Sequence, residues 1–231
     1  MYDMEKNFER ALCKDRAYAA RPAVSDNKIV WQDRRDATSQ NNLSFDIYMY
    51  DLEKNEETRV TEMQHEQSRP DISGNMIVYS GMAFHPLHLY AYNLKSKQHS
   101  QVDTLRMEEE DNYSISGRTI ACYKSGVLST SPGIFIYDVN SLNRETIIEG
   151  EPNSCWYGTI NNSGNAIAWS QPRFNNSYDI FVHDRSTGNE LRITTDDAYN
   201  LYPYVKGNNL IWVNQYMICI LLNCLLMPSR R

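Results

Sequence analysis

Residues 21–31 read Arg-Pro-Ala-Val-Ser-Asp-Asn-Lys-Ile-Val-Trp, and residues 69–79 repeat them as Arg-Pro-Asp-Ile-Ser-Gly-Asn-Met-Ile-Val-Tyr. Looser copies follow at 113–122, 158–169 and 203–212. The copies are aligned on one apolar position, which is occupied by Val24, Ile72, Ile115, Ile160 and Val205. The steps between these anchors are 48, 43, 45 and 45 residues. A fixed period of this length decides the architecture, because each copy must be one small structural unit.

A second motif follows each of the first four copies. It alternates β-branched, aromatic and polar residues, as strands do, and occupies 46–52, 88–94, 133–139 and 179–185. A polar turn and another short strand come next, for example at 58–61 and 191–194. Each repeat therefore predicts four antiparallel strands, and the chain is predicted to be an all-β protein, a β-propeller of four-stranded antiparallel blades. A β-sandwich or a solenoid of hairpins is the alternative, although neither predicts so regular a period.

The ends of the chain bear on how many blades there are. We expect one domain over 1–231, with blades at about 21–61, 69–104, 112–150, 157–195 and 202–222. The segment Glu9 to Cys13 aligns with Glu57 to Thr61, and the fifth copy stops after a possible third strand in 217–222. Residues 8–13 are therefore predicted to close a five-bladed ring as an outer strand. Because the tail at 215–231 departs from the repeat, a fragment of a longer propeller is the alternative.

Composition limits the partners. The chain has 29 acidic and 23 basic residues and a formal charge of −6, so we expect no broad basic surface and no nucleic-acid partner. The first twenty residues are too charged for a signal peptide, and the apolar run at 217–227 is too short to span a bilayer. Five cysteines at irregular spacings argue against a disulfide framework and a zinc site. No membrane insertion is expected.

The motifs together resemble a known family. Pro-x-Ile-Ser-Gly-Asn-x-Ile-Val, followed by Asp-Ile-Tyr-x-Tyr-Asp-Leu and Arg-Ile-Thr, is similar to the TolB-type, WD40-like β-propeller repeat found also in archaeal and bacterial cell-surface proteins. The resemblance covers about residues 9–213. It implies a propeller that often serves as a binding scaffold in the periplasm or at the cell surface, sometimes beside a peptidase or lyase domain. The residues themselves leave the compartment undetermined.

Binding residues are expected on one face. The loops at 32–45, 80–87, 124–132 and 170–178 are long and share a face, together with 62–68 and 196–201. The residue just before each innermost strand would surround the mouth of the central channel, at Arg21, Arg69, Asn112, Tyr157 and Tyr202. Guanidinium forks, phenols and an amide suit a peptide or sugar that bears a carboxylate. Alternatively, these side chains only hydrogen-bond neighbouring blades.

No motif predicts catalysis. Gly-x-Ser-x-Gly, His-Glu-x-x-His and phosphate-binding glycine loops do not occur, and we expect no catalytic residue, metal or cofactor. His85 and His88 lack a third ligand, the acid pair Asp33 and Asp36 suits a solvated loop, and the tryptophans are expected in the core: Trp31, Trp169 and Trp212. The sequence predicts a monomeric, non-catalytic module that binds a protein, peptide or glycan. The alternatives are the propeller part of a hydrolase, an oligogalacturonate-lyase-like enzyme, and a structural repeat of a surface layer.

Overall fold

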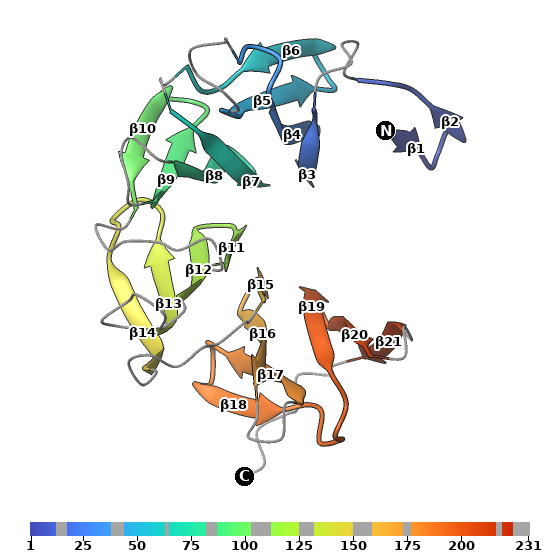
Figure 1. Ribbon diagram of the computed structural model, residues 1–231, viewed down its shortest axis with the longest axis vertical. Coiled ribbons are helices and arrows are strands. Elements are labelled where there is room, and N and C mark those ends of the chain that lie inside the picture. The colour runs from blue at the N-terminus through green and yellow to red at the C-terminus, as the bar shows by residue number, and fades with distance from the viewer. Residues whose placement is uncertain are drawn as a thin grey trace. The chain divides into compact units, whose positions relative to one another are not determined.

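The computed structural model shows an all-β chain (Figure 1). It describes residues 1–12, 18–37, 44–62, 65–81, 87–102, 112–124, 132–149, 159–172, 177–215 and 219–223. Every regular element within this described part is a β-strand. The chain divides into two compact units, Met1–Gln101 and Val102–Arg231.

The first unit holds a hairpin and two four-stranded antiparallel sheets. The hairpin pairs β1 (Tyr2–Asp3) with β2 (Phe8–Glu9). The first sheet has the order β3 (Ala20–Ser25), β4 (Lys28–Asp33), β5 (Asp46–Asp51), β6 (Glu56–Arg59). The second has the order β7 (Gln67–Ser73), β8 (Met76–Gly81), β9 (His88–Asn93), β10 (Gln98–Gln101).

The second unit holds two further four-stranded antiparallel sheets and one sheet with three described strands. The first is β11 (Asn112–Ser116), β12 (Thr119–Lys124), β13 (Gly133–Asp138), β14 (Arg144–Glu149). The next is β15 (Ile160–Ser163), β16 (Ala166–Pro172), β17 (Tyr178–Asp184), β18 (Asn189–Arg192). The last is β19 (Asn200–Lys206), β20 (Asn209–Asn214), β21 (Cys219–Asn223). The four-stranded antiparallel sheet is therefore confirmed for the first four repeats, and the possible strand in 217–222 of the fifth is seen as β21.

The N-terminal segment differs from the expectation. Glu9 pairs with Tyr2 in the β1–β2 hairpin, and Arg10 donates its backbone N–H to the Met1 carbonyl at 3.0 Å. Cys13, the end of the predicted closing strand, lies outside the described residues. The hairpin forms because Asn7 tolerates a positive φ of 49° at the turn. Ring closure by residues 8–13 stays a prediction.

Short polar motifs shape the outer hairpin of each sheet. The Asp51 carboxylate ends β5 and accepts the backbone N–H groups of Glu53 at 3.0 Å and Lys54 at 3.1 Å. The residues at the same place in the other four-stranded sheets also accept turn N–H groups: Asn93, Asp138 and Asp184. Such a side chain replaces the backbone acceptor of a turn. The Asp or Asn that ends the third strand thus encodes the turn between the third and fourth strands of these sheets.

The Arg-x-Thr motif fastens the outer strand to the third strand. In the first sheet Thr61 Oγ1 accepts the Ile47 N–H at 2.8 Å, and Arg59 Nη2 lies 2.8 Å from the buried Asp46 carboxylate. Arg59 Nε also donates to the Thr61 carbonyl at 2.9 Å. We call this arrangement the Asp-Arg-Thr clasp. It satisfies a buried carboxylate where the fourth strand leaves the sheet.

Consecutive sheets of one unit share apolar cores. In the first unit, Val30, Ile47 and Met49 of the first sheet pack with Ile72 and Tyr79 of the second. Two further clusters join consecutive sheets of the second unit. Burial of apolar side chains between sheet faces is the main force that stacks blades.

The structure corrects the alignment of the fourth repeat. Val24 pairs with Ile29 and Ile72 with Ile77, and the residue at this position in the fourth repeat is Asn162, which pairs with Ile167. Ile160, the anchor used above, lies two residues earlier. Asn162 is buried and polar, and its Oδ1 accepts the Ser114 hydroxyl at 2.8 Å. This hydrogen bond allows an amide at a position that is otherwise apolar.

Candidate functional site

Three of the five predicted channel-mouth residues share an unusual backbone. Arg21, Arg69 and Tyr202 have positive φ values of 51°, 55° and 54°. Each lies inside an innermost strand rather than before it, at a β-bulge where the register with the next strand shifts. Each also precedes a proline. We call these three residues the bulge residues.

This conformation is disfavoured twice. A side chain with a Cβ in the left-handed region costs about 1–2 kcal/mol, and a residue before proline prefers extended φ values near −120°. Glycine would avoid the first cost, yet arginine and tyrosine occupy the sites. Strained backbone of this kind persists only where neighbouring groups hold it, and it concentrates at functional positions.

Neighbouring sheets hold two of the bulges. The backbone N–H of Arg69 donates to Gln32 Oε1 of the preceding sheet at 2.8 Å. The backbone N–H of Tyr202 donates to Thr159 Oγ1 at 3.1 Å, and Thr159 in turn contacts Ser170, the counterpart of Gln32. The backbone at these two bulges is thus fixed from the side by the neighbouring sheet.

The other two predicted residues behave differently. Asn112 is the first residue of β11 and pairs in regular register with Tyr123, without a bulge. Tyr157 lies outside the described residues. With Asn162 as the anchor, the true counterpart of Arg69 in the fourth repeat is Thr159, which sequence reasoning missed. An alignment of the turn Ser163-Gly164-Asn165 with Ser73-Gly74-Asn75 would have identified Thr159 from the sequence.

Charged groups surround the loop end of the first unit. Asp33 was expected in a solvated loop and is instead completely buried, with Arg35 Nη2 at 2.7 Å and Trp31 Nε1 at 3.2 Å. Burial opposes ionisation of Asp33, but hydrogen bonds from Arg35 and Trp31 outweigh it and keep the pKa below its ordinary value. For Asp46 burial dominates, and its pKa is raised in spite of Arg59. Each of the two buried carboxylates has an arginine partner, Arg35 for Asp33 and Arg59 for Asp46.

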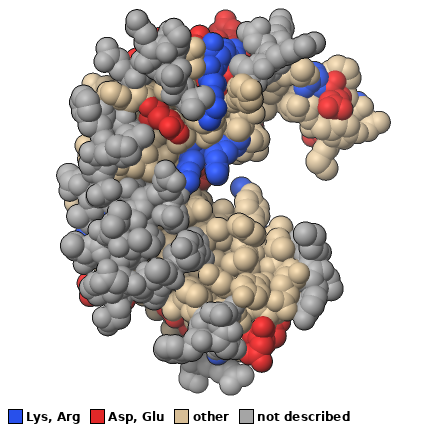
Figure 2. Space-filling model, viewed as in Figure 1, with Lys and Arg blue, Asp and Glu red and all other residues tan. Residues whose placement is uncertain are grey.

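Arg34 presents a cation at the same end. Its guanidinium carbon lies 4.1 Å from the centre of the Phe45 ring and 5.7 Å from that of Tyr18. Lys and Arg side chains of this unit gather on one face, from the region of β5 and β6 toward β3 and β7 (Figure 2). Stacking on aromatic rings orients a guanidinium while leaving its donors available at the edge. The loop end of the first unit carries carboxylates as well, and they pair with two of its arginines, Arg35 and Arg59.

Several other residues can be assigned to the core. Trp31, Trp169 and Trp212 are buried, as predicted, and each indole N–H donates to a polar side chain: Asp33, Gln171 and Asn200. Within the described residues, no group of three or more His, Cys, Asp and Glu side chains is placed to hold a metal ion. Among those same residues there is no helix with the length and apolar character needed to cross a membrane.

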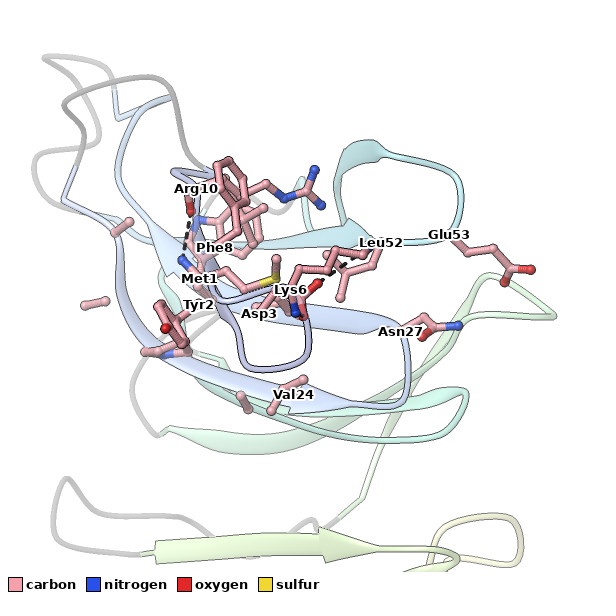
Figure 3. A pocket seen from close by; sticks show the side chains of 17 residues that line it. Met1, Tyr2, Asp3, Lys6, Phe8, Arg10, Val24, Asn27, Leu52 and Glu53 are labelled. Atoms are coloured by element: carbon pink, nitrogen blue, oxygen red, sulfur yellow. Dashed lines mark hydrogen bonds and ion pairs between the residues drawn. The ribbon is translucent and has the colours of Figure 1, made fainter.

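A cavity of about 1230 Å³ lies in the first unit between the β1–β2 hairpin and the first sheet (Figure 3). Met1, Tyr2 and Phe8 line it from the hairpin, and Val24 and Trp31 from the sheet. Arg10 ties the hairpin to the sheet, since its Nη1 donates to Asn55 Oδ1 at 3.1 Å and its guanidinium lies over the Tyr50 ring. The lining is mostly apolar, and two of its charged residues, Asp3 and Lys6, pair with each other at 3.6 Å.

Solved structures with this fold include two TolB proteins and a peptidase. TolB from Acinetobacter baumannii matches with a TM-score of 0.60 and 16% identity, over 92% of this chain and 55% of that one. A putative TolB from Agrobacterium tumefaciens matches with a TM-score of 0.64 and 13% identity, over 92% and 76%. The acylaminoacyl peptidase of Pyrococcus horikoshii matches with a TM-score of 0.60 and 15% identity, over 86% and 35%.

The fold is therefore a TolB-like β-propeller fold, shared with acylaminoacyl peptidase, and identities this low show the fold alone. The chain spans 55% of the length of the Acinetobacter protein. No protein-family model and no curated protein matches the sequence.

Proposed function

We propose that this chain is a non-catalytic binding module that holds a carboxylate-bearing peptide or glycan at the two bulge arginines of the first unit, Arg21 and Arg69, on its long-loop face. Much of that face consists of loop residues outside the described part, so the proposal is built on the strand residues beside them.

One observation carries the proposal. Arg21, Arg69 and Tyr202 keep the same left-handed backbone before proline, where glycine would be less strained. Tyr202 is 62% exposed and Arg21 is exposed, so packing of their side chains does not account for the strain. A recognition role for the side chains would account for the strain, because a ligand binds more tightly to groups that are already held in position.

The chemistry of the two arginines indicates the ligand. Arg21 and Arg69 occupy equivalent positions on β3 and β7, the innermost strands of adjacent sheets in the first unit (Figure 1). A guanidinium binds a carboxylate through two parallel hydrogen bonds, which the uncharged ester or amide cannot reproduce. The ligand class is therefore an acidic one.

The test compares matched acid and neutral ligands by isothermal titration calorimetry. Short peptides with a free C-terminus are set against their C-terminal amides, and oligogalacturonates against their methyl esters. We expect the acid forms to bind and the neutral forms to bind about tenfold to a hundredfold more weakly. Arg21→Gln and Arg69→Gln should each remove most of this preference, whereas Arg144→Gln, at an exposed arginine of the outer strand β14, should not.

Equal affinity for the acid and neutral forms would contradict the proposal. That outcome would favour a second candidate, the propeller part of a hydrolase. The fold shared with acylaminoacyl peptidase supports this candidate. A propeller of that kind would contact peptides without depending on a free carboxylate. The failure of every probe to bind would exclude both.

A further inference from the structure

Neighbouring sheets within each unit meet through a repeated backbone contact. The N–H of Gly74, in the second sheet, donates to Ser25 Oγ of the first sheet at 3.0 Å. Gly164 donates to Ser116 at 3.1 Å and Gly207 to Ser163 at 3.3 Å in the second unit. In each case a serine at the end of one innermost strand accepts from the turn glycine of the next sheet. This contact marks a blade–blade interface.

An apolar position next to that contact is buried at the same interfaces. Ile72 is 4% exposed because it packs in the cluster formed with Val30 and Ile47 of the preceding sheet. Val205 is equally buried, in a cluster with Ala168 and Ile180 of its preceding sheet. Each sheet thus presents this position to the sheet before it.

The first sheet has the same position, and within the described part of its own unit no four-stranded sheet precedes it. Val24, the counterpart of Ile72, is 68% exposed. The turn position that holds glycine in the later sheets holds Asp26, which is exposed and keeps the glycine-like φ of 50°. Its backbone is therefore shaped for the contact, and its side chain adds a negative charge there.

The last sheet has the complementary defect. Val213 is 41% exposed, whereas its counterparts in the other four sheets are buried: Gln32, Ser80, Tyr123 and Ser170. Tyr204 is 51% exposed on the same face. The acceptor position held by Ser25, Ser116 and Ser163 holds Lys206, which is exposed. This face therefore carries a positive charge where the first sheet carries a negative one.

We infer that a second copy of this chain covers the exposed face of the first sheet, with the β19–β20–β21 sheet of one copy packed on β3 and β4 of the other. Tyr204 and Val213 meet Val24, and the Lys206 ammonium pairs with the Asp26 carboxylate in place of the serine–glycine hydrogen bond. Every described interface between consecutive sheets joins one face of each of these two kinds. The exposed face of the first sheet and the exposed face of the last sheet should therefore fit each other. The opposite charges fix the register.

The β1–β2 hairpin lies over part of the same face. The cavity that separates it from Val24 and Trp31 has room for several side chains of an incoming sheet (Figure 3). The hairpin rests on the sheet through Arg10 at Asn55 and Tyr50, near the outer strands. A chain without residues 1–10 should therefore associate at least as strongly as the full chain. The association departs from the monomer that the sequence analysis expected.

Sedimentation equilibrium of the full chain over a wide concentration range tests the inference. We expect the mass to rise above the 26.9 kDa of a single chain as concentration increases. Lys206→Glu and Asp26→Lys should each weaken association about tenfold, because each places like charges in contact. The double variant with both changes should recover it. Lys95→Glu, at an exposed turn lysine, is the matched control and should have no effect.

Because Val24, Asp26 and Lys206 are exposed in the single chain, these variants should fold, and their circular dichroism spectra should match the parent's. Val24→Glu provides an uncharged-to-charged change at the centre of the same face and should abolish association. A mass that stays at 26.9 kDa at every concentration would overturn the inference. Association that neither charge reversal alters would overturn the assigned interface.

Discussion

The hydroxyl of Thr194 donates a hydrogen bond to the completely buried carboxylate of Asp179, with 3.0 Å between Oγ1 and Oδ1. Thr194 Oγ1 also accepts the Ile180 N–H at 2.9 Å, and Arg192 Nε lies 3.0 Å from Asp179 Oδ2. This is the Asp-Arg-Thr clasp of the first sheet repeated about 130 residues along the chain. Its recurrence in both units indicates that the clasp is a structural part of the repeat rather than a binding site.

Replacement of the clasp threonine should therefore destabilise the protein. Thr194→Val keeps the shape and the β-branch but removes both hydrogen bonds, leaving a buried N–H and part of a buried carboxylate unsatisfied. We expect a loss of about 1–3 kcal/mol in the free energy of unfolding. Urea denaturation followed by tryptophan fluorescence measures it.

Thr58→Val is the matched control, because Thr58 is exposed on the outer strand β6 and belongs to no clasp. Its effect should stay within about 0.5 kcal/mol. If Thr194→Val were as harmless as Thr58→Val, the clasp would have no energetic role.

Val24 and Ile72 test the difference between an open and a covered sheet face. Ile72→Ala removes side-chain atoms from the core between two sheets and should destabilise the fold by about 2–4 kcal/mol. Val24→Ala changes an exposed position and should cost less than about 1 kcal/mol in dilute solution. Both values come from urea denaturation at low protein concentration. Equal losses would mean that the first sheet is covered within the single chain.

The repeat predicted most of the fold. Strand order and turn positions followed from the alternation of apolar and polar residues, since a strand buries every second side chain. The sequence motif contains the clasp residues Asp46, Arg59 and Thr61, but it does not predict the contacts between them. Periodicity gives the positions of such residues and says nothing about which hydrogen bonds join them.

The candidate site was less predictable. Arg21, Arg69 and Tyr202 were found as equivalent positions, but their β-bulge and positive φ were not, because a residue before proline is normally extended. The fourth repeat was misaligned because Asn162 replaces an apolar anchor, and only its hydrogen bond with Ser114 explains why an amide is tolerated there. An alignment based on the hydrophobic pattern misses buried polar residues whose hydrogen bonds are made with a neighbouring sheet.

The turn aspartates predict how stability depends on pH. The Ser141 N–H lowers the pKa of Asp138 most, burial opposes it, and Arg118 adds to the lowering, which brings the pKa to about 2. Because this value lies below the unfolded value of about 3.9, the contribution is fully present above pH about 4 and is lost as the pH falls toward 2. Asp138→Asn should therefore flatten the acid limb of the stability profile, as measured by thermal unfolding between pH 2 and pH 6.

Asn93 provides the reciprocal variant. It holds the same turn in the second sheet with an amide, which does not titrate. Asn93→Asp should add stability above pH about 4 and steepen the acid limb. Profiles of the same slope in both variants and in the parent would show that these turns do not control the acid response.

Gly133 and Gly207 differ in the space around them. Both have positive φ, at 147° and 55°, but a Cβ on Gly133 would overlap the carbonyl oxygen of Ile148, whereas one on Gly207 would meet nothing within 4 Å. Gly133→Ala should destabilise by about 2–4 kcal/mol, because both the backbone and the β13–β14 pairing must shift. Gly207→Ala should cost about 1 kcal/mol of conformational strain. Thermal unfolding distinguishes the two, and similar melting temperatures would contradict the close packing at Gly133.

Tyr202 and Tyr204 separate backbone strain from side-chain contribution within one strand. Both are more than half exposed, but only Tyr202 has a positive φ. Tyr202→Gly relieves about 1–2 kcal/mol of left-handed strain and loses about 1 kcal/mol through the more flexible unfolded chain, so stability should stay level or rise slightly. Tyr204→Gly gains no such relief and should lose about 1 kcal/mol. If chemical denaturation shows Tyr202→Gly to be the more damaging change, the phenol stabilises the fold, and the strain at the bulge needs no ligand to explain it.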